Sequence, residues 1–364
     1  MKYHRLWSGL KPGCGRSEPL LSFRDRVQSE LDIVTRGAMK FAACGFLTAL
    51  AVFGLAPVAY SQTNFPSHVV RLIVPYPAGG ATDVVARVVA EKMSDALGQT
   101  IVVENRPGAG TMIGASAVAR SPADGYTVLI GDTGTYSLNA TLYAEKLSYD
   151  PAKDFAPVCQ TGRVPLVLAT NPNVVKVGSV GELIELAKKE PGKINFGAPG
   201  PGSPIHLALE LFRQRAGIQL SAVPYKGGAD ALTDLLGGRI GLLFIDAATG
   251  LPHIKSGALK ALAIGTEERI PTAPDVPTMA EAGIPNFEAY AWNGLAVPAG
   301  TPLRVVNQLS EACQNALKMP GVIKKLEELS VQPAPSTPEE FAMFIKAESA
   351  KWHDVITKAG ISLN

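Results

Sequence analysis

Residues 70–87 constrain the fold of this chain more than any other stretch of the sequence. The β-branched, apolar run Val70–Val74 is typical of a buried strand. Prolines and glycines at positions 75–80 end that strand, and a helix is predicted to follow with Thr82 or Asp83 as its N-cap. A strand, a loop poor in side chains and a helix N-terminus leave backbone N–H groups and the positive end of a helix dipole free. The stretch therefore predicts a site for a small anion.

The composition excludes several classes of function. Of the 364 residues, 46% are hydrophobic, so the chain can bury a large core, and its length favours two domains. A formal net charge of +2, without a long basic run, argues against a nucleic-acid partner. Aromatic residues make up only 7%, which argues against a stacking platform for bases or sugars. We therefore predict no nucleic-acid partner.

Residues 39–61 have the pattern of an export signal. A short positive start precedes the uncharged apolar run 41–59, and small residues surround a cleavage point after Ser61. This predicts a Sec-type signal peptide, a mature N-terminus at Gln62 and a periplasmic protein of a Gram-negative bacterium. A retained anchor is the alternative, because the run is near the shortest length that crosses a bilayer. We interpret residues 1–38 as the product of a start codon assigned too far upstream, or else as a true extension.

Cysteines and histidines give no sign of a metal or a cofactor. Cys159 and Cys313 remain after removal of the leader, in a predicted strand and a predicted helix far apart along the chain. They could pair in an oxidising compartment, although we favour two buried free thiols. The histidines of the mature chain show no ligand spacing. We predict no metal and no cofactor.

Strands and helices alternate along the mature chain, which predicts an α/β fold with parallel sheets and helices on both faces. Predicted strands are Val70–Pro75, Ile101–Glu104, Thr127–Gly131, Ala156–Thr170, Asn195–Gly197, Ala222–Pro224, Gly241–Ile245 and Leu259–Ile264. Predicted helices are Asp83–Leu97, Met112–Ala119, Val180–Lys189, Pro204–Ala216, Ala229–Gly237, Ala247–Ser256, Leu303–Met319 and Pro338–Ala359. The last helix begins with a capping-box signature, Thr337-Pro-Glu-Glu340.

The second half of the chain repeats the opening pattern. Residues 195–206 again read as a strand, a Gly/Pro-rich loop and a helix start, with Ser203 as the candidate N-cap. Ligands of open α/β sheets bind beyond the carboxyl ends of the strands, where these loops lie. Two α/β lobes with such loops predict a ligand cleft between them.

One string imitates a dinucleotide fingerprint. In Gly108–Gly114 the last glycine comes one residue late, and residues 104–107 separate the glycines from the strand. Neither a nucleophile elbow nor a catalytic triad or carboxylate pair is suggested by local context. The sequence therefore predicts a binding protein and not an enzyme.

Several blocks taken together resemble the Bug-type substrate-binding proteins of tripartite tricarboxylate transporters, from about residue 65 to residue 361. The order and spacing of these blocks carry the resemblance. The blocks are Arg71–Asp83, Val102–Gly110, Ala123–Gly131, Tyr149–Pro157, Val223–Gly228, Ala261–Ile264 and Pro274–Thr278.

This resemblance implies a two-domain, periplasmic-binding-protein-like fold of type II, a Venus flytrap with two crossing hinge strands. The crossings would fall near residues 158–168 and 287–297. Domain 1 would comprise residues 62–161 plus 292–364, and domain 2 residues 162–291.

The resemblance also implies which residues bind the ligand, whose carboxylates would meet loop amides, ordered waters and hydroxyls. One wall of the cleft would be Pro77, Ala78, Gly79, Gly80, Asp83, Asp132, Thr133 and Thr135, with Ser137 and Asn139 nearby. The opposite wall would be Ala198, Gly200, Gly202, Ser203, Tyr225, Lys226 and Gly227, with Asp246 near the floor.

Some of these residues have a structural alternative. Asp83 fits a helix cap better than a ligand contact, and Lys226 could be a solvated loop charge. Asp246 either satisfies a backbone or hinge amide, which we favour, or binds an ammonium group on the ligand. Trp292 either covers the cleft or packs at the hinge, and the sequence favours neither.

The sequence thus predicts a periplasmic receptor, acting as a monomer, that captures a small carboxylate by domain closure and delivers it to membrane permease subunits. A ligand-sensing adaptor of a signalling system is the main alternative, and an enzyme acting on carboxylates is a further one. The ligand itself is open, because di- and tricarboxylates, aromatic acids, amino acids and amides all fit a site rich in backbone groups.

Overall fold

The computed structural model describes residues 65–364, which belong to one compact unit. The predicted start assignment, signal peptide and mature N-terminus at Gln62 lie outside the described residues. Between Phe65 and Asn364, no helix is both long and apolar enough to cross a membrane.

The first group of strands is built around β1 (Val70–Val74) and is called lobe 1 below. β1 pairs in parallel with β2 (Ile101–Asn105) and β3 (Thr127–Asp132). β9 (Tyr290–Pro298) then lies antiparallel between β3 and the first half of β4 (Phe155–Thr170). Helices of this lobe are α2 (Ala81–Leu97), α3 (Met112–Ala119), α9 (Leu303–Leu317) and α10 (Pro320–Glu328).

The second group, lobe 2, starts from the other half of β4. There β4 pairs antiparallel with β7 (Leu242–Asp246) and β8 (Lys260–Ile264). β5 (Asn195–Pro199) pairs in parallel with β6 (Ser221–Tyr225) and with β7. Helices of this lobe are α5 (Val180–Lys189), α6 (Pro204–Ala216), α7 (Gly228–Leu236) and α8 (Ala247–Lys255).

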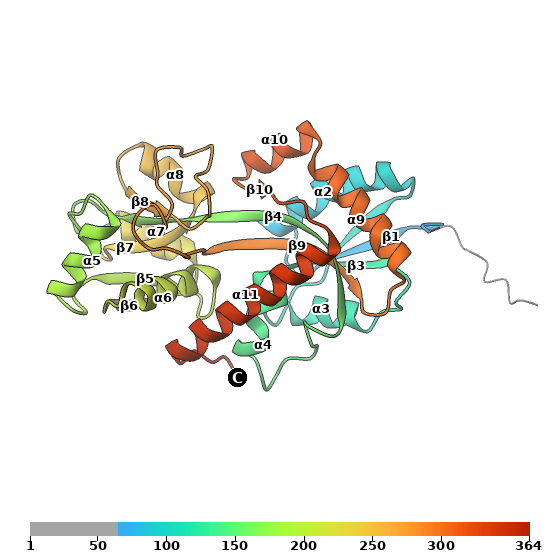
Figure 1. Cartoon of the computed structure of the whole chain (residues 1–364), viewed down its shortest axis with the longest axis horizontal. Coiled ribbons are helices and arrows are strands. Elements are labelled where there is room, and N and C mark those ends of the chain that lie inside the picture. The colour runs from blue at the N-terminus through green and yellow to red at the C-terminus, as the bar shows by residue number, and fades with distance from the viewer. Residues whose placement is uncertain (1–64) are drawn as a thin grey trace, which may run out of the picture. The chain divides into compact units, whose positions relative to one another are not determined.

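β4 is the strand that joins the two lobes, as Figure 1 shows. Its residues 155–165 pair with β9, and its residues 166–170 pair with β7 and β8. The predicted parallel pairing is present in β1–β3 and in β5–β7, but it does not extend over the whole sheet. β4 and β9 run antiparallel to their neighbours, which makes the sheet mixed.

Several short elements escaped the sequence analysis because each is a single turn or one short helix. They are the π-helical turn η1 (Gly134–Leu138), α4 (Asn139–Leu142), α10 and the two-residue strand β10 (Gln332–Pro333). Two predicted caps are confirmed. Ser203 caps α6, and Thr337 forms a capping box with Glu340 at the start of α11 (Pro338–Ala359).

Helix α11 contacts both lobes, and in Figure 1 it runs from below the strands of lobe 1 to α6. Near its start, Phe341 packs edge-on against Trp292 and Tyr136 in the core of lobe 1. Near its end, Trp352 lies in the core of lobe 2, and the Gln214 side chain of α6 donates to the Val355 carbonyl at 3.0 Å. The helix is thus a third connection between the lobes, beside β4 and the chain before β9.

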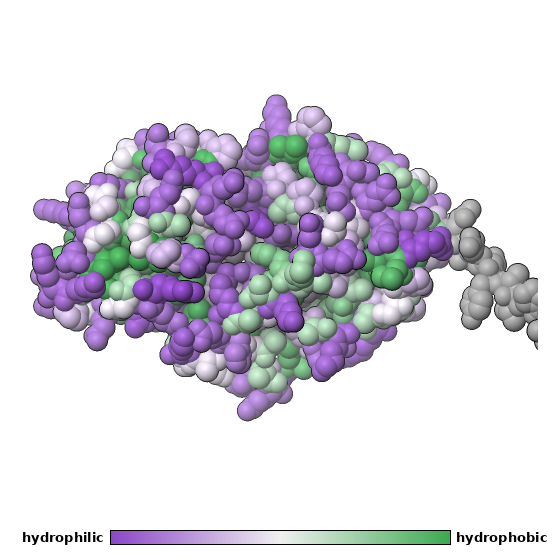
Figure 2. All heavy atoms as spheres, viewed as in Figure 1, coloured by the Kyte–Doolittle hydropathy of each residue, from purple (hydrophilic) through white to green (hydrophobic). Residues whose placement is uncertain are grey.

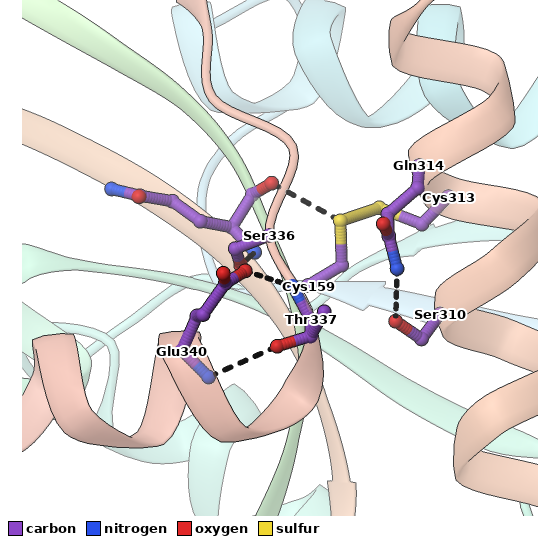
Figure 3. Close-up of a disulfide and its surroundings, with 8 residues drawn as sticks. Cys159, Ser310, Cys313, Gln314, Ser336, Thr337 and Glu340 are labelled. Atoms are coloured by element: carbon purple, nitrogen blue, oxygen red, sulfur yellow. Dashed lines mark hydrogen bonds between the residues drawn. A yellow bond between two sulfur atoms is a disulfide. The ribbon is translucent and has the colours of Figure 1, made fainter.

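Cys159 of β4 and Cys313 of α9 form a disulfide, with their Cα atoms 6.5 Å apart (Figure 3). The favoured expectation of two free thiols is therefore wrong, since packing of α9 on the sheet brings these distant positions together. Close by, the Gln160 N–H donates to Ser336 Oγ at 3.0 Å, just before α11 begins. The disulfide thus attaches α9 to the strand that joins the lobes.

Candidate functional site

A cavity of about 520 Å³ lies between the two lobes, where the loops after β1 and β5 face each other. Its lining comes from both groups of strands, as the predicted cleft requires. Of the predicted binding residues, those that line it are Pro77, Asp132, Gly200, Gly202 and Ser203, and Asn139 joins them. Sequence reasoning missed Tyr76 in this lining, although its place between two prolines at a strand end was a signal.

The loop after β1 is exposed at Pro77, Ala78, Gly79 and Gly80, and Gly79 has a left-handed backbone with φ +84°. Helix α2 begins at Ala81 with Gly80 as its N-cap residue, so the predicted caps Thr82 and Asp83 are wrong. Within the described chain, no acceptor is bonded to the N–H groups of Ala81, Thr82 and Asp83. The open helix N-terminus predicted from the sequence is thus present. The loop before it lines the cavity at Pro77, whereas Ala78, Gly79, Gly80 and Asp83 are not among the lining residues.

Asp83 closes this loop instead of capping the helix. Its carboxylate is 2% exposed and accepts from the Gly79 N–H at 2.9 Å, from Asn105 Nδ2 at 2.8 Å and from two nitrogens of Arg87. Hydrogen bonding from Arg87, with help from Gly79 and Asn105, lowers the pKa of Asp83 to about 2. Every lone pair is engaged within the protein, so the carboxylate holds the loop in place.

The loop after β3 differs from the prediction. Asp132 is half-buried and accepts from the Tyr76 hydroxyl, from the Thr135 N–H at 2.9 Å and from Thr135 Oγ1 at 2.8 Å. Burial and the neighbouring Asp132 raise the pKa of Tyr76, which keeps its hydroxyl a donor. Asp132 is therefore held on its own lobe by three donors.

The hydroxyl groups expected to face the ligand lie inside the wall. Thr133 is fully buried and accepts from the Trp292 N–H of β9 at 3.0 Å. Thr135 and Ser137 are also buried, and Asn139 Nδ2 donates to the Gly110 carbonyl at 2.8 Å. The three hydroxyl groups therefore bond within the protein, that of Thr133 to β9, that of Thr135 to Thr111 before α3 and that of Ser137 to Ser349 of α11, while Asn139 lines the cavity.

The loop after β5 forms the other wall. Gly200 and Gly202 both have left-handed backbones, and a Cβ on Gly202 would come within 2.6 Å of Leu142 in α4. Ser203 accepts from the His206 N–H at 3.2 Å, and the Gly202 N–H donates to His206 Nδ1 at 3.1 Å. Burial lowers the pKa of His206, which favours the neutral ring that accepts this bond.

The remaining predicted residues of lobe 2 lie outside the cavity lining. Ala198 is buried, and the Tyr225 hydroxyl donates to Asp234 at 2.9 Å. Lys226 is exposed, and Gly227 is the N-cap residue of α7 without a side-chain cap. The loop after β6 is thus present on the same side of the sheet, without contact to the cavity.

Asp246 ends β7 and occupies the N-cap position of α8, yet its side chain does not cap that helix. No described residue hydrogen-bonds or ion-pairs with its carboxylate, and burial raises its pKa. The structural role favoured from the sequence, satisfaction of a backbone or hinge amide, is not found.

Trp292 is fully buried, which settles its two predicted alternatives. Its ring stacks at 6.0 Å on Tyr136, and its indole N–H donates to Glu348 Oε2 at 3.0 Å. The Trp352 indole donates to the same oxygen at 2.9 Å, and Lys351 also pairs with Glu348. Trp292 therefore packs where β9 meets α11 and does not cover the cleft.

No group of three or more His, Cys, Asp or Glu side chains within residues 65–364 could hold a metal ion.

Comparison with known proteins finds relatives along most of this chain. The family model described as "Tripartite tricarboxylate transporter family receptor" matches residues 85–361. Protein BugT of Bordetella pertussis is 38% identical over 322 residues, which cover 86% of this chain and 98% of BugT.

Two solved structures from Rhodopseudomonas palustris are similar over the described part. A protein solved with adipate is 38% identical, with 82% of this chain and 99% of that chain covered and a TM-score of 0.68. MatC with bound malate is 33% identical, with 80% of this chain and 100% of that chain covered and a TM-score of 0.64. These comparisons confirm the predicted two-domain fold of a periplasmic binding protein, a class of solute-binding proteins and not of enzymes.

Proposed function

Because this chain belongs to the family of tripartite tricarboxylate transporter receptors, we propose that it captures a small carboxylate in the cleft between its lobes. The two relatives from Rhodopseudomonas palustris hold adipate and malate, and both molecules are dicarboxylates. A ligand of the same class suits the cavity of about 520 Å³ found here.

The open N-terminus of α2 is the observation that carries this proposal. The N–H groups of Ala81, Thr82 and Asp83 have no acceptor in the described chain, and the loop that leads into them lines the cavity at Pro77. Hydrogen bonds from such groups to a carboxylate contribute on the order of 1.5–3 kcal/mol each, so a few suffice for micromolar binding. Asp83 does not repel the ligand strongly, because Arg87 neutralises its charge.

We divide the mature protein into residues 62–161 plus 292–364 and residues 162–291, the two bodies that close on the ligand. The continuous strand β4, the chain before β9 and helix α11 are the connections about which they would rotate. Closure excludes water from the carboxylate and strengthens its hydrogen bonds.

Export by the signal peptide at residues 39–61 would deliver the mature protein, starting at Gln62, to the periplasm. There the closed, ligand-bound monomer would be recognised by membrane permease subunits. On the face shown in Figure 2, hydrophilic residues cover most of the surface and hydrophobic residues lie in patches among them, as expected for a face exposed to water.

Replacement of the N-cap residue tests the anion site directly. Gly80 has an extended backbone that any residue adopts, and in Gly80→Asp the new carboxylate would cap α2 and occupy its free N–H groups. We expect affinity for adipate or malate, measured by calorimetry, to fall about tenfold or more while stability is kept.

Ala96→Asp is the matched control, because it adds the same charge at an exposed position in the last turn of α2, at the opposite end of the helix. Wild-type affinity in Gly80→Asp, or an equal loss in the control, would show that the carboxylate binds elsewhere.

A further inference from the structure

Three aspartates stand where a strand or loop meets a helix near the cleft, and only two of them are paired. Asp83 accepts from Gly79, Arg87 and Asn105, and Asp132 accepts from Tyr76 and Thr135. Asp246 accepts from no described residue. The same chain thus satisfies two carboxylates of its cleft region fully and leaves a third without a partner.

Strand pairing places Asp246 at the cleft end of lobe 2. β7 is flanked by β4, where Leu166 is opposite Asp246, and by the parallel strand β5. Phe196 of β5 is in register with Leu242 and the two strands run parallel, so the loop after β5, which lines the cavity at Gly200, leaves the sheet at the same edge as Asp246. Asp246 therefore lies next to the loop that forms the wall of lobe 2.

Asp246 also does not form the helix-capping hydrogen bond that is possible at its N-cap position. Aspartate is among the most favourable N-cap residues, because its carboxylate accepts from the free N–H groups of the first helical turn, a contact that contributes about 1 kcal/mol. Here the backbone of Asp246 is in the N-cap position of α8, and its side chain makes no such bond. The carboxylate thus has no hydrogen-bond partner in its own helix.

In the protein without ligand, the unpaired carboxylate of Asp246 is energetically unfavourable. Asp246 is half-buried, this burial raises its pKa, and no lysine, arginine or histidine pairs with it in residues 65–364. A positively charged group entering the cleft would remove this penalty. A neutral hydroxyl would satisfy a lone pair and leave the charge uncompensated.

We propose that Asp246 binds a protonated amine of the ligand, so that the receptor selects a small carboxylate that also carries an ammonium group. This inference rests on the proposed function: the carboxylate meets the N-terminus of α2 on lobe 1, and the ammonium meets Asp246 on lobe 2. A ligand with both groups joins the lobes in the closed state, whereas a simple carboxylate of the same length contacts lobe 2 less strongly.

Matched ligand pairs test this selectivity. The full mature protein is titrated by calorimetry with 2-aminoadipate against adipate, and with aspartate against succinate and malate. We expect at least one amino acid to bind about tenfold or more tightly than its counterpart without the amine. In Asp246→Asn, which keeps the shape and removes the charge, we expect this preference to fall to about threefold or less.

The control variant is Glu185→Gln, which removes one negative charge from the exposed face of α5 in the same lobe. It should keep the wild-type preference. Thermal unfolding without ligand adds a second readout: Asp246→Asn should be as stable as the wild type or more so, because no bond is lost. A lowered midpoint would indicate a structural role and overturn the inference.

The outcomes separate the two proposals. Binding of adipate, succinate or malate without any gain from the amine overturns the inference and leaves the proposed function standing. A preference for the amine that persists in Asp246→Asn assigns the ammonium to another residue. If none of these ligands binds, with or without the amine, both proposals are overturned.

Discussion

Replacement of Asp83 by asparagine should loosen the loop that presents the N-terminus of α2. The carboxylate holds the loop by accepting from Gly79 on one side and from Arg87 and Asn105 on the other. An asparagine keeps one acceptor and turns an NH2 group toward these donors. The variant should therefore lose both the charge and part of the hydrogen-bond set.

The magnitude follows from the pKa of Asp83, which falls from 3.8 to about 2 in the folded protein. A shift of this size corresponds to about 2 kcal/mol of stability above pH 5. Arg87 is half exposed, so solvent screening makes this figure an upper bound for the ionic part. The hydrogen bonds from Arg87, Gly79 and Asn105 are the cause of this shift, and we expect Asp83→Asn to lower the free energy of unfolding by about 2 kcal/mol at pH 7.

The sign of the pH dependence is determined by the lowered pKa. The stabilisation is complete above the unfolded pKa and is lost as pH falls through the folded pKa of about 2. At pH 3 about half of it should remain, so the difference between wild type and variant should shrink by about half.

Urea unfolding followed by circular dichroism at pH 7 and pH 3 measures these differences. Asp95→Asn is the control, because this aspartate lies on the same helix with 68% of its side chain exposed, and it should change stability little at either pH. A difference for Asp83→Asn that is the same at both pH values would refute the assignment of its stability to the paired carboxylate.

Three further outcomes are expected. Replacement of Cys159 and Cys313 by serine opens a loop of 154 residues and should cost up to about 5 kcal/mol, measured by urea unfolding against the oxidised wild type. Glu348→Gln removes a buried charge bonded to both indoles of the described chain, and should lower stability by about 2–3 kcal/mol and shift the tryptophan emission spectrum. Gly202→Ala places a Cβ against Leu142 in a left-handed backbone, and should lower the thermal midpoint by several degrees through about 1–2 kcal/mol of strain.

Local signals predicted the strands and helices well, since apolar runs and turn residues act over a few positions. The loop after β1 and the caps of α6 and α11 are examples. The antiparallel direction of β4 and β9 could not be predicted from local signals, because it depends on how the two lobes share strands. The same holds for the disulfide, whose cysteines meet only after α9 packs on the sheet.

The candidate site likewise has features that could be predicted from the sequence and features that could not. Backbone features such as the open start of α2 follow from sequence, because they depend on the residues of one loop. Side-chain directions do not. Thr133 bonds to Trp292, which is distant in the sequence, whereas Asp83 holds its own loop and Asp246 has no partner among the described residues.

The end of the described chain lies beside the cleft. Leu363 lines the cavity, and its N–H donates to the Leu142 carbonyl at 2.8 Å, while Asn364 accepts from the Glu145 N–H at 3.0 Å. Any purification tag joined after Asn364 would therefore start at the mouth of the ligand site and crowd it. A small environment-sensitive dye attached at that residue would, for the same reason, report ligand entry as a change in its fluorescence.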